Sequence, residues 1–131
     1  MFQRAFLAAQ ALGIAERTHQ AMFDAVWKTG ELAVVTPGNN RLKDPLPSIT
    51  DAAHFYARVA SVDPQKFLAM ANSFGVDSKI RAADAQVLAM HVDSTPTLIV
   101  NGKYRVIRDA LQGNDQVIEL VQYLVAKESS P

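Results

Sequence analysis

The sequence has 131 residues, about half of them apolar, which suffices for one hydrophobic core and is short for two independently folding domains. Thirteen basic residues balance thirteen acidic ones without a run of like charge, so we expect neither nucleic acid nor a membrane surface as a partner. No apolar stretch approaches the roughly 20 residues of a membrane-spanning helix, and the absence of cysteine excludes disulfides, thiolate metal sites and a cysteine nucleophile in this chain.

Two helices are predicted at the start of the sequence. Nearly every residue from Phe2 to Leu12 is apolar, and Gly13 follows where a left-handed helix cap is needed. A second helix is predicted from about Ala15 to Lys28, with Gly30 ending it. Spacings of three and four place four apolar side chains on one face of this helix, Met22, Phe23, Val26 and Trp27. That spacing favours a core face over an aromatic platform for a ligand.

A loop and a third helix come next. The segment Thr36–Pro47 contains three prolines, one glycine and an Asn-Asn pair, a composition typical of turns. Ser48 or Thr50 can cap the following helix, and Asp51 stands near its positive end. We expect five apolar residues of this helix to face the core, Ile49, Ala52, Phe55, Tyr56 and Val59.

Two more helices precede the first predicted strand. Asp63-Pro64 starts the fourth helix, because the carboxylate caps the free amides and proline loses no hydrogen bond at the first helical position. Phe74-Gly75 is predicted to close it. Asp77 is predicted to cap the fifth helix, which continues to His91.

A β-hairpin is predicted near the end of the chain. Thr97–Val100 is apolar and rich in β-branched residues, and Lys103–Val106 alternates polar with apolar residues. Asn101-Gly102 lies between them and is the strongest short hairpin signal, because both central turn positions need a positive φ. A two-stranded hairpin is marginal in water, so we expect its edges and an apolar row that includes Leu98 and Val100 to need a cover.

A last helix is predicted to open at Asn114 or Asp115. Its apolar residues Val117, Val121 and Leu124 fall on one side. The tail from Lys127 to Pro131 is expected to fray. The complete pattern is that of an α/β, helix-rich chain.

Few side chains point to chemistry of their own. His19, His54 and His91 fall on separate predicted helices without carboxylates at ligand spacing, which favours surface or packing roles over a metal site. Asp93 and Ser94 are better explained by local turn hydrogen bonds than by catalysis. We therefore predict no catalytic residue, no metal ligand and no cofactor.

The most informative segment is Val92–Tyr104, which reads VDSTPTLIVNGKY. A proline directly before a buried strand removes a donor and often marks a tight turn or a cis bond. This segment resembles the cis-proline loop and following hairpin of the thioredoxin superfamily, in the form found in DsbA-like thiol:disulfide oxidoreductases. The helices are similar to the DsbA helices in order. The resemblance implies an incomplete thioredoxin-like fold, with a helical insertion at 1–77 and a C-terminal remnant at 78–131.

The resemblance also implies a function and a site. In DsbA-like proteins a Cys-x-x-Cys motif precedes the helical insertion, and here nothing precedes it, so the chain is interpreted as a redox-inactive fragment or truncated form of such a protein. The family forms disulfide bonds in secreted proteins and is periplasmic. The resemblance implies that the substrate-binding loop is present in this chain. The backbone of Thr95 would pair with an extended or unfolded peptide, and Pro96 is expected to be cis. We expect no signal peptide in this chain, because Met1–Arg4 does not start one.

Two other interpretations stay open. A cysteine-free DsbA-like module could bind peptides through Thr95 and Pro96 without chemistry. A glutathione-transferase kappa type of enzyme shares the helical insertion, but its thiol-activating residue would also lie in the absent N-terminal part. In either case the exposed hairpin edge makes a homodimer, formed by pairing or domain swapping, a candidate assembly.

Overall fold

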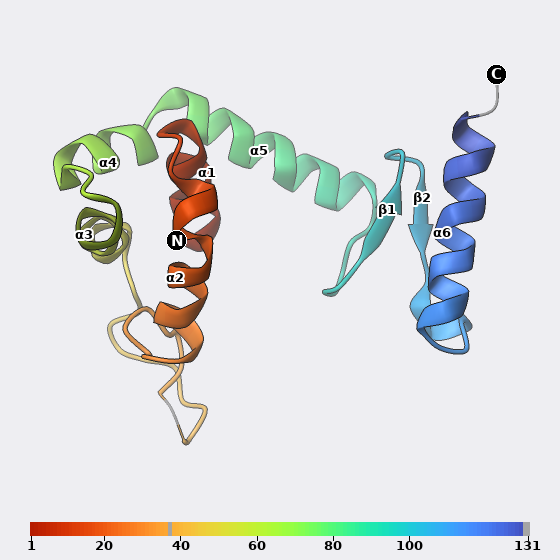
Figure 1. Ribbon diagram of the computed structural model, residues 1–131, viewed down its shortest axis with the longest axis horizontal. Coiled ribbons are helices and arrows are strands. Elements are labelled where there is room, and N and C mark those ends of the chain that lie inside the picture. Colours follow the sequence, from red (N-terminus) through yellow and green to blue (C-terminus); the bar gives the residue numbers. More distant parts are fainter. Residues whose placement is uncertain (37, 130–131) are drawn as a thin grey trace. The chain divides into compact units, whose positions relative to one another are not determined.

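The computed structural model describes residues 1–36 and 38–129 and is helix-rich, with one two-stranded antiparallel sheet (Figure 1). It divides into a first unit, Met1–Ala82, and a second unit that begins at Ala83, and each is described by itself. In chain order the elements are α1 Phe2–Ala11, α2 Ala15–Trp27, α3 Ile49–Ala60, α4 Pro64–Ala71, α5 Phe74–Ala89, β1 Leu98–Val100, β2 Tyr104–Val106, the 3-10 helix η1 Arg108–Ala110 and α6 Asn114–Ser129. The predicted helix-rich α/β fold with one hairpin is confirmed.

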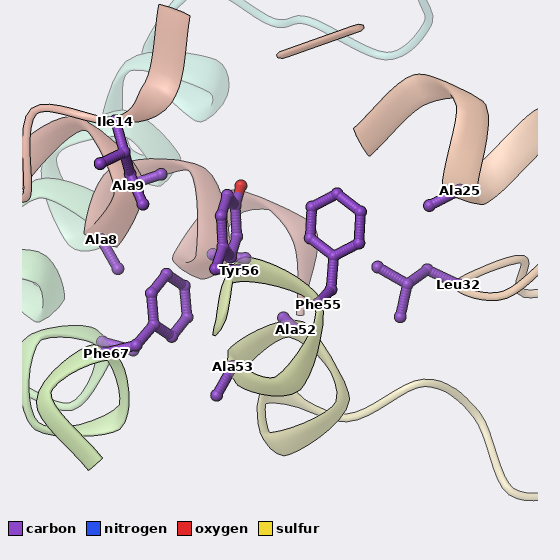
Figure 2. Close-up of a cluster of buried hydrophobic side chains, with 12 residues drawn as sticks. Ala8, Ala9, Ile14, Ala25, Leu32, Ala52, Ala53, Phe55, Tyr56 and Phe67 are labelled. Carbon is purple, nitrogen blue, oxygen red and sulfur yellow. The ribbon is translucent and has the colours of Figure 1, made fainter. Parts of the chain in front are cut away.

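Small residues bring the helices of the first unit close together. Ala8 and Ala9 of α1 and Ala52 and Ala53 of α3 have no exposed surface, and α1 contacts both α3 and α4. Because the methyl side chains at these positions are small, the helix backbones approach closely, and the larger core side chains fill the space on either side. Figure 2 shows these alanines in the same cluster as the aromatic residues of α3 and α4.

The centre of this core is aromatic. The Tyr56 ring stacks on the Phe67 ring at 4.7 Å between centroids, and the Phe55 ring meets the Tyr56 ring edge-on at 5.1 Å (Figure 2). Offset stacking and edge-on contacts are the arrangements that aromatic quadrupoles favour. Burial raises the pKa of the Tyr56 phenol, an effect that a hydrogen bond with Thr18 partly offsets.

Local capping chemistry fixes several helix ends as predicted. Gly13 has φ +69°, and the amides of Gly13 and Ile14 close the end of α1 on the carbonyls of Gln10 and Ala9. Ser48 caps α3 in a capping box with Asp51, whose pKa the hydrogen bonds from Ser48 lower. Asp63 accepts a hydrogen bond from the Lys66 amide at the start of α4, as predicted for Asp63-Pro64.

The junction between α4 and α5 differs from the prediction. The residue that caps α5 is Ser73, whose hydroxyl accepts a hydrogen bond from the Val76 amide at 3.3 Å, and Phe74 and Gly75 belong to α5. Asp77 lies inside the first turn, where its carboxylate pairs with Arg4 at 2.6 Å. The predicted capping role of Asp77 is therefore wrong, because a tertiary ion pair engages that side chain.

The end of α5 also differs from the prediction. The helix stops at Ala89, and His91 has φ +49°. The His91 amide donates to the Leu88 carbonyl, and the Val92 amide donates to the Val87 carbonyl, which is the double bond pattern of a Schellman motif. His91 therefore terminates the helix instead of extending its predicted apolar face.

The face of α2 that packs inward was predicted only in part, because Met22 and Val26 pack against the core as predicted but Phe23 and Trp27 do not. Thr18 and Ala25 are its buried residues, whereas Phe23 is 50% exposed and Trp27 is 74% exposed. The Thr18 hydroxyl donates to the Ile14 carbonyl at 2.7 Å, which satisfies its polar group inside the core. The smaller side chains let α2 approach the rest of the unit, and the two aromatic rings lie at the margin of that contact.

The second unit is a hairpin packed on a helix. β1 pairs with β2 in antiparallel register, with Leu98 opposite Val106 and Val100 opposite Tyr104. Both Asn101 and Gly102 have positive φ, and the Lys103 amide donates to the Val100 carbonyl, as expected for an Asn-Gly turn. The register leaves three residues, not two, between the strands.

Helix α6 covers one face of this hairpin. Val100 and Val106 are buried against Leu124, with Val121 packed beside them, so α6 supplies the cover that the sequence predicted Val100 to need. The adjacent residues Leu98 and Ile99 are each 39% exposed. The helix begins at Asn114 and continues to Ser129, which corrects the predicted fraying from Lys127; residues 130–131 lie outside the described part.

Candidate functional site

The loop between α5 and β1 carries both residues that the sequence singled out. Thr95 and Pro96 are exposed, and the peptide bond that joins them is cis. The Thr97 hydroxyl donates to the Ser94 carbonyl at 2.6 Å, and the Ser94 hydroxyl donates to the Asp93 carboxylate at 3.0 Å. These short-range bonds hold the loop on both sides of the Thr95–Pro96 step and leave that step open to solvent.

A side chain of the hairpin fastens the start of the same loop. The Arg105 guanidinium donates to the His91 carbonyl at 2.5 Å and lies 3.9 Å from the Asp93 carboxylate. Arg105 comes from β2, so the strand that follows the loop also restrains the residues that precede it. The loop is thereby anchored at its base while its tip remains exposed.

The backbone at the tip of the loop is available for pairing. Neither the amide nor the carbonyl of Thr95 has a hydrogen-bond partner among residues 1–36 and 38–129. Backbone donors and acceptors are obligatory hydrogen-bonding groups, so here they are satisfied by solvent or by an incoming chain. The arrangement can accept an extended peptide by main-chain hydrogen bonds.

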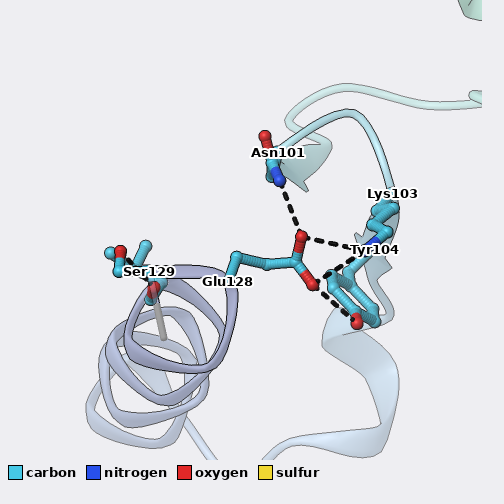
Figure 3. A network of polar contacts seen from close by, with 6 residues as sticks. Asn101, Lys103, Tyr104, Glu128 and Ser129 are labelled. Carbon is cyan, nitrogen blue, oxygen red and sulfur yellow. Dashed lines mark hydrogen bonds and ion pairs between the residues drawn. The ribbon is translucent and has the colours of Figure 1, made fainter. Parts of the chain in front are cut away.

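The Glu128 carboxylate of α6 holds the turn of the hairpin through several hydrogen bonds. Glu128 accepts hydrogen bonds from the Asn101 amide at 2.7 Å, the Lys103 ammonium at 3.0 Å and the Tyr104 hydroxyl at 3.0 Å (Figure 3). The Lys127 ammonium lies 5.4 Å from the centre of the Tyr104 ring. One carboxylate thus joins the turn to the last helix.

These contacts shift the pKa values of Glu128 and Lys103. The Lys103 ammonium and the Asn101 amide lower the pKa of Glu128, and the carboxylate raises the pKa of Lys103. Sequence reasoning missed Glu128, because its partners lie more than 20 residues earlier in the chain and no local pattern connects them. Its opposite charge to Lys103 is the only signal that the sequence contains.

The other polar residues considered in the sequence do not converge on a reactive centre. Asp93 and Ser94 bond to each other in the turn, as the local interpretation predicted. In the part of the chain that the structure describes, no group of three or more His, Asp and Glu side chains is arranged to hold a metal ion. Within the same residues, no helix combines the length and apolarity that crossing a bilayer requires.

The sequence is similar to curated DsbA proteins along most of its length, although no family model matches it. It is 31% identical to the thiol:disulfide interchange protein DsbA of Pseudomonas aeruginosa over 123 residues, which are 94% of this chain and 52% of that protein. Identity to the DsbA of Azotobacter vinelandii is 30% over 125 residues, 95% of this chain and 52% of that protein. The chain therefore spans about half the length of the curated relatives that it matches.

Solved structures agree with the sequence comparison. The crystal structure of the oxidoreductase DsbA from Xylella fastidiosa superposes with a TM-score of 0.71 at 33% identity, covering 95% of this chain and 59% of that one. The crystal structure of Pseudomonas aeruginosa DsbA gives a TM-score of 0.72 at 30% identity, covering 95% and 58%. The chain is therefore DsbA-like, in sequence and in its thioredoxin-like fold with a helical insertion, over the part of DsbA that it spans.

Proposed function

We propose that this chain forms the substrate-binding part of a DsbA-like, periplasmic thiol:disulfide interchange protein. The observation that carries the proposal is the exposed loop at Thr95–Pro96, which presents unpaired backbone groups on an anchored scaffold. An extended peptide would pair with the Thr95 backbone, and the side chains of the peptide would face the solvent or a reactive dithiol. Residues 1–77 would act as the helical insertion, and residues 78–131 as the thioredoxin-like part.

The redox step needs groups from outside this chain. Disulfide exchange begins with the attack of a thiolate on a disulfide sulfur and passes through a mixed disulfide. The chain contains no cysteine, so it supplies neither the attacking thiolate nor the leaving thiol. We propose that the chain alone is redox-inactive and that a Cys-x-x-Cys segment of the complete protein performs the exchange.

A DsbA of known structure illustrates the kind of ligand proposed. A Proteus DsbA variant was solved with the non-covalently bound peptide PWATCDS; its 20% identity to this chain supports likeness of fold alone. We propose peptides of this extended, unfolded kind as ligands of the Thr95–Pro96 loop. Non-covalent binding would suffice, because the pairing uses main-chain hydrogen bonds.

A cysteine-free binding module is the second candidate, and the complete lack of cysteine favours it. Such a module would hold extended peptides through the same loop without chemistry. Leu98 and Ile99 remain partly exposed on the hairpin, so a homodimer that covers this edge belongs to either candidate.

The native mass separates the candidates, and an exchange assay tests the redox inactivity that both share. The intact mass of the native protein, captured from its source cells with an antibody to this chain, shows extra mass and a dithiol that can be alkylated if the interchange protein is correct. A native mass equal to that of this chain supports the binding module instead. In a thiol-disulfide exchange assay the chain alone should match the no-protein control, and activity above that control would contradict the proposed redox inactivity.

Peptide binding tests the loop itself. Pro96→Ala should weaken the binding of an extended peptide, because proline restricts the loop that presents Thr95. Pro64→Ala is a matched control, since Pro64 stands at the first position of α4 in the other unit. Equal binding by both variants would contradict the assignment of the loop.

A further inference from the structure

A large apolar groove lies in the first unit. Its volume is about 600 Å³, and most of its wall consists of side chains from α1 and α2. The main contributors are Phe2, Phe6, Met22, Phe23, Val26 and Trp27. Phe6, Phe23 and Trp27 are 45%, 50% and 74% exposed, so three aromatic rings line one concavity without being covered. Contiguous exposed apolar patches often mark protein interaction sites or ligand-binding grooves.

The chemistry of the wall selects a neutral ligand. None of the described residues that line the groove is Lys, Arg, Asp or Glu, and its polar groups come from His19, Asn40 and Tyr56. The Lys28 ammonium at the end of α2 is paired with Asp24 at 2.8 Å. A fatty-acid carboxylate or a phosphate would therefore enter without a cation to replace its hydration, which is costly. Uncharged aromatic and aliphatic groups meet no such cost.

A free backbone edge adjoins the groove. Val35 pairs with Leu42 in an isolated antiparallel bridge. The two hydrogen bonds of that bridge are made by the residues next to Val35. The Thr36 amide donates to the Arg41 carbonyl at 2.7 Å, and the Lys43 amide donates to the Val34 carbonyl at 2.9 Å. In this pattern the amide and carbonyl of Val35 itself point away from Leu42.

This edge has no partner in the part of the chain that the structure describes. Among residues 1–36 and 38–129, no group accepts from the Val35 amide or donates to its carbonyl. Val34 and Val35 both line the groove, so an extended chain paired with Val35 would place alternate side chains beside the aromatic wall. A small organic molecule would use the wall but not the edge.

We propose that this groove is a second polypeptide-binding site, which takes neutral, apolar side chains of an extended chain while the Val35 backbone pairs with it. The site goes beyond the proposed function, because it uses none of the residues of the Thr95–Pro96 loop. It provides binding to unfolded segments rich in aromatic or aliphatic residues.

Trp27 gives a direct readout, because it is the only tryptophan of the sequence and lines the groove. Titration of the full chain with a short blocked peptide of alternating Phe and Ser should give a saturable blue shift of its fluorescence. A peptide of Ser alone should give none. The signal arises in the first unit and is independent of Thr95 and Pro96, so failure of one site does not imply failure of the other.

Variants and a modified peptide test the two parts of the site. Phe23→Ala should weaken binding roughly tenfold, as expected for losing a half-exposed aromatic contact. Tyr123→Ala is the matched control, because Tyr123 is 63% exposed on α6, and its affinity should equal that of the unaltered chain. Methylation of the peptide backbone nitrogens should also weaken binding, because it removes the donors that pair with Val35 and leaves the Phe side chains intact.

Three outcomes would overturn the proposal. A methylated peptide that binds as tightly as its parent would exclude pairing with the Val35 edge. A small neutral aromatic amide that reproduces both the shift and the affinity of the peptide would show a small-molecule pocket. A blue shift that grows with protein concentration in the absence of peptide would identify a second copy of the chain as the occupant.

Discussion

Replacing Leu124 with alanine removes the largest of the three buried side chains that join the hairpin to α6. Leu124 is 8% exposed and packs with Val100 and Val106. Deletion of three carbon groups at about 0.8 kcal/mol each, together with an unfilled cavity, gives a loss of about 3 kcal/mol in the free energy of unfolding. A unit of roughly 50 residues has a stability of about 2.5 to 7 kcal/mol, so this loss would remove between about 40% of that stability and all of it.

The assay for this prediction must distinguish the two units. Hydrogen exchange of the Val100 and Val106 amides should accelerate in Leu124→Ala, while the amides of Phe55 and Phe67 in the first unit keep their protection. Val125→Ala is the matched control, because Val125 is 50% exposed on the same helix and its replacement should change stability by less than about 0.5 kcal/mol. Equal effects of the two substitutions on the hairpin amides would refute the packing of α6 on the sheet.

Three further predictions follow from polar contacts. The folded state lowers the pKa of Glu128, so the stability that this carboxylate contributes is present above its unfolded pKa and is lost as the pH falls through its folded pKa. Glu128→Gln should therefore flatten the acid dependence of hydrogen exchange at the hairpin amides. An unchanged pH profile would contradict this role of Glu128. Ser48→Ala should lower the free energy of unfolding of the first unit by about 1 kcal/mol in urea titrations, whereas no change would exclude the capping box. Thr97→Val removes the bond to the Ser94 carbonyl, so peptide affinity at the loop should fall; equal affinity would show that this bond does not shape the loop.

Several correct predictions rested on short-range interactions. Asp63 was identified correctly, and Ser48 was one of the two caps proposed for its helix, because a cap bonds to amides within three residues. Asn101-Gly102 was correct for the same reason, since both residues adopt the positive φ that the turn needs. Local chemistry of this kind is independent of how the chain packs.

Two of the wrong predictions, for Asp77 and for the face of α2, involved contacts between distant segments, whereas the end of α5 at His91 was wrong although its bonds are local. Asp77 has the composition of a cap, but its pairing with Arg4 cannot be deduced from the spacing of residues around it. Periodicity also grouped Phe23 and Trp27 with the core, because it identifies a face of α2 without showing how far that face extends into the contact. The likeness of Val92–Tyr104 to DsbA was informative because a proline, a strand and a turn stand there in fixed order.

The most direct test of the central claim is a nitrogen-15 NMR titration of the full chain with the peptide PWATCDS. We expect saturable shifts of the Ser94, Thr95 and Thr97 amides, because the peptide would pair with the exposed backbone of that loop. Shifts near Val35 and Trp27 would report the groove of the first unit separately. A saturating peptide that leaves the three loop amides unmoved would contradict the assignment of this loop as the substrate-binding site.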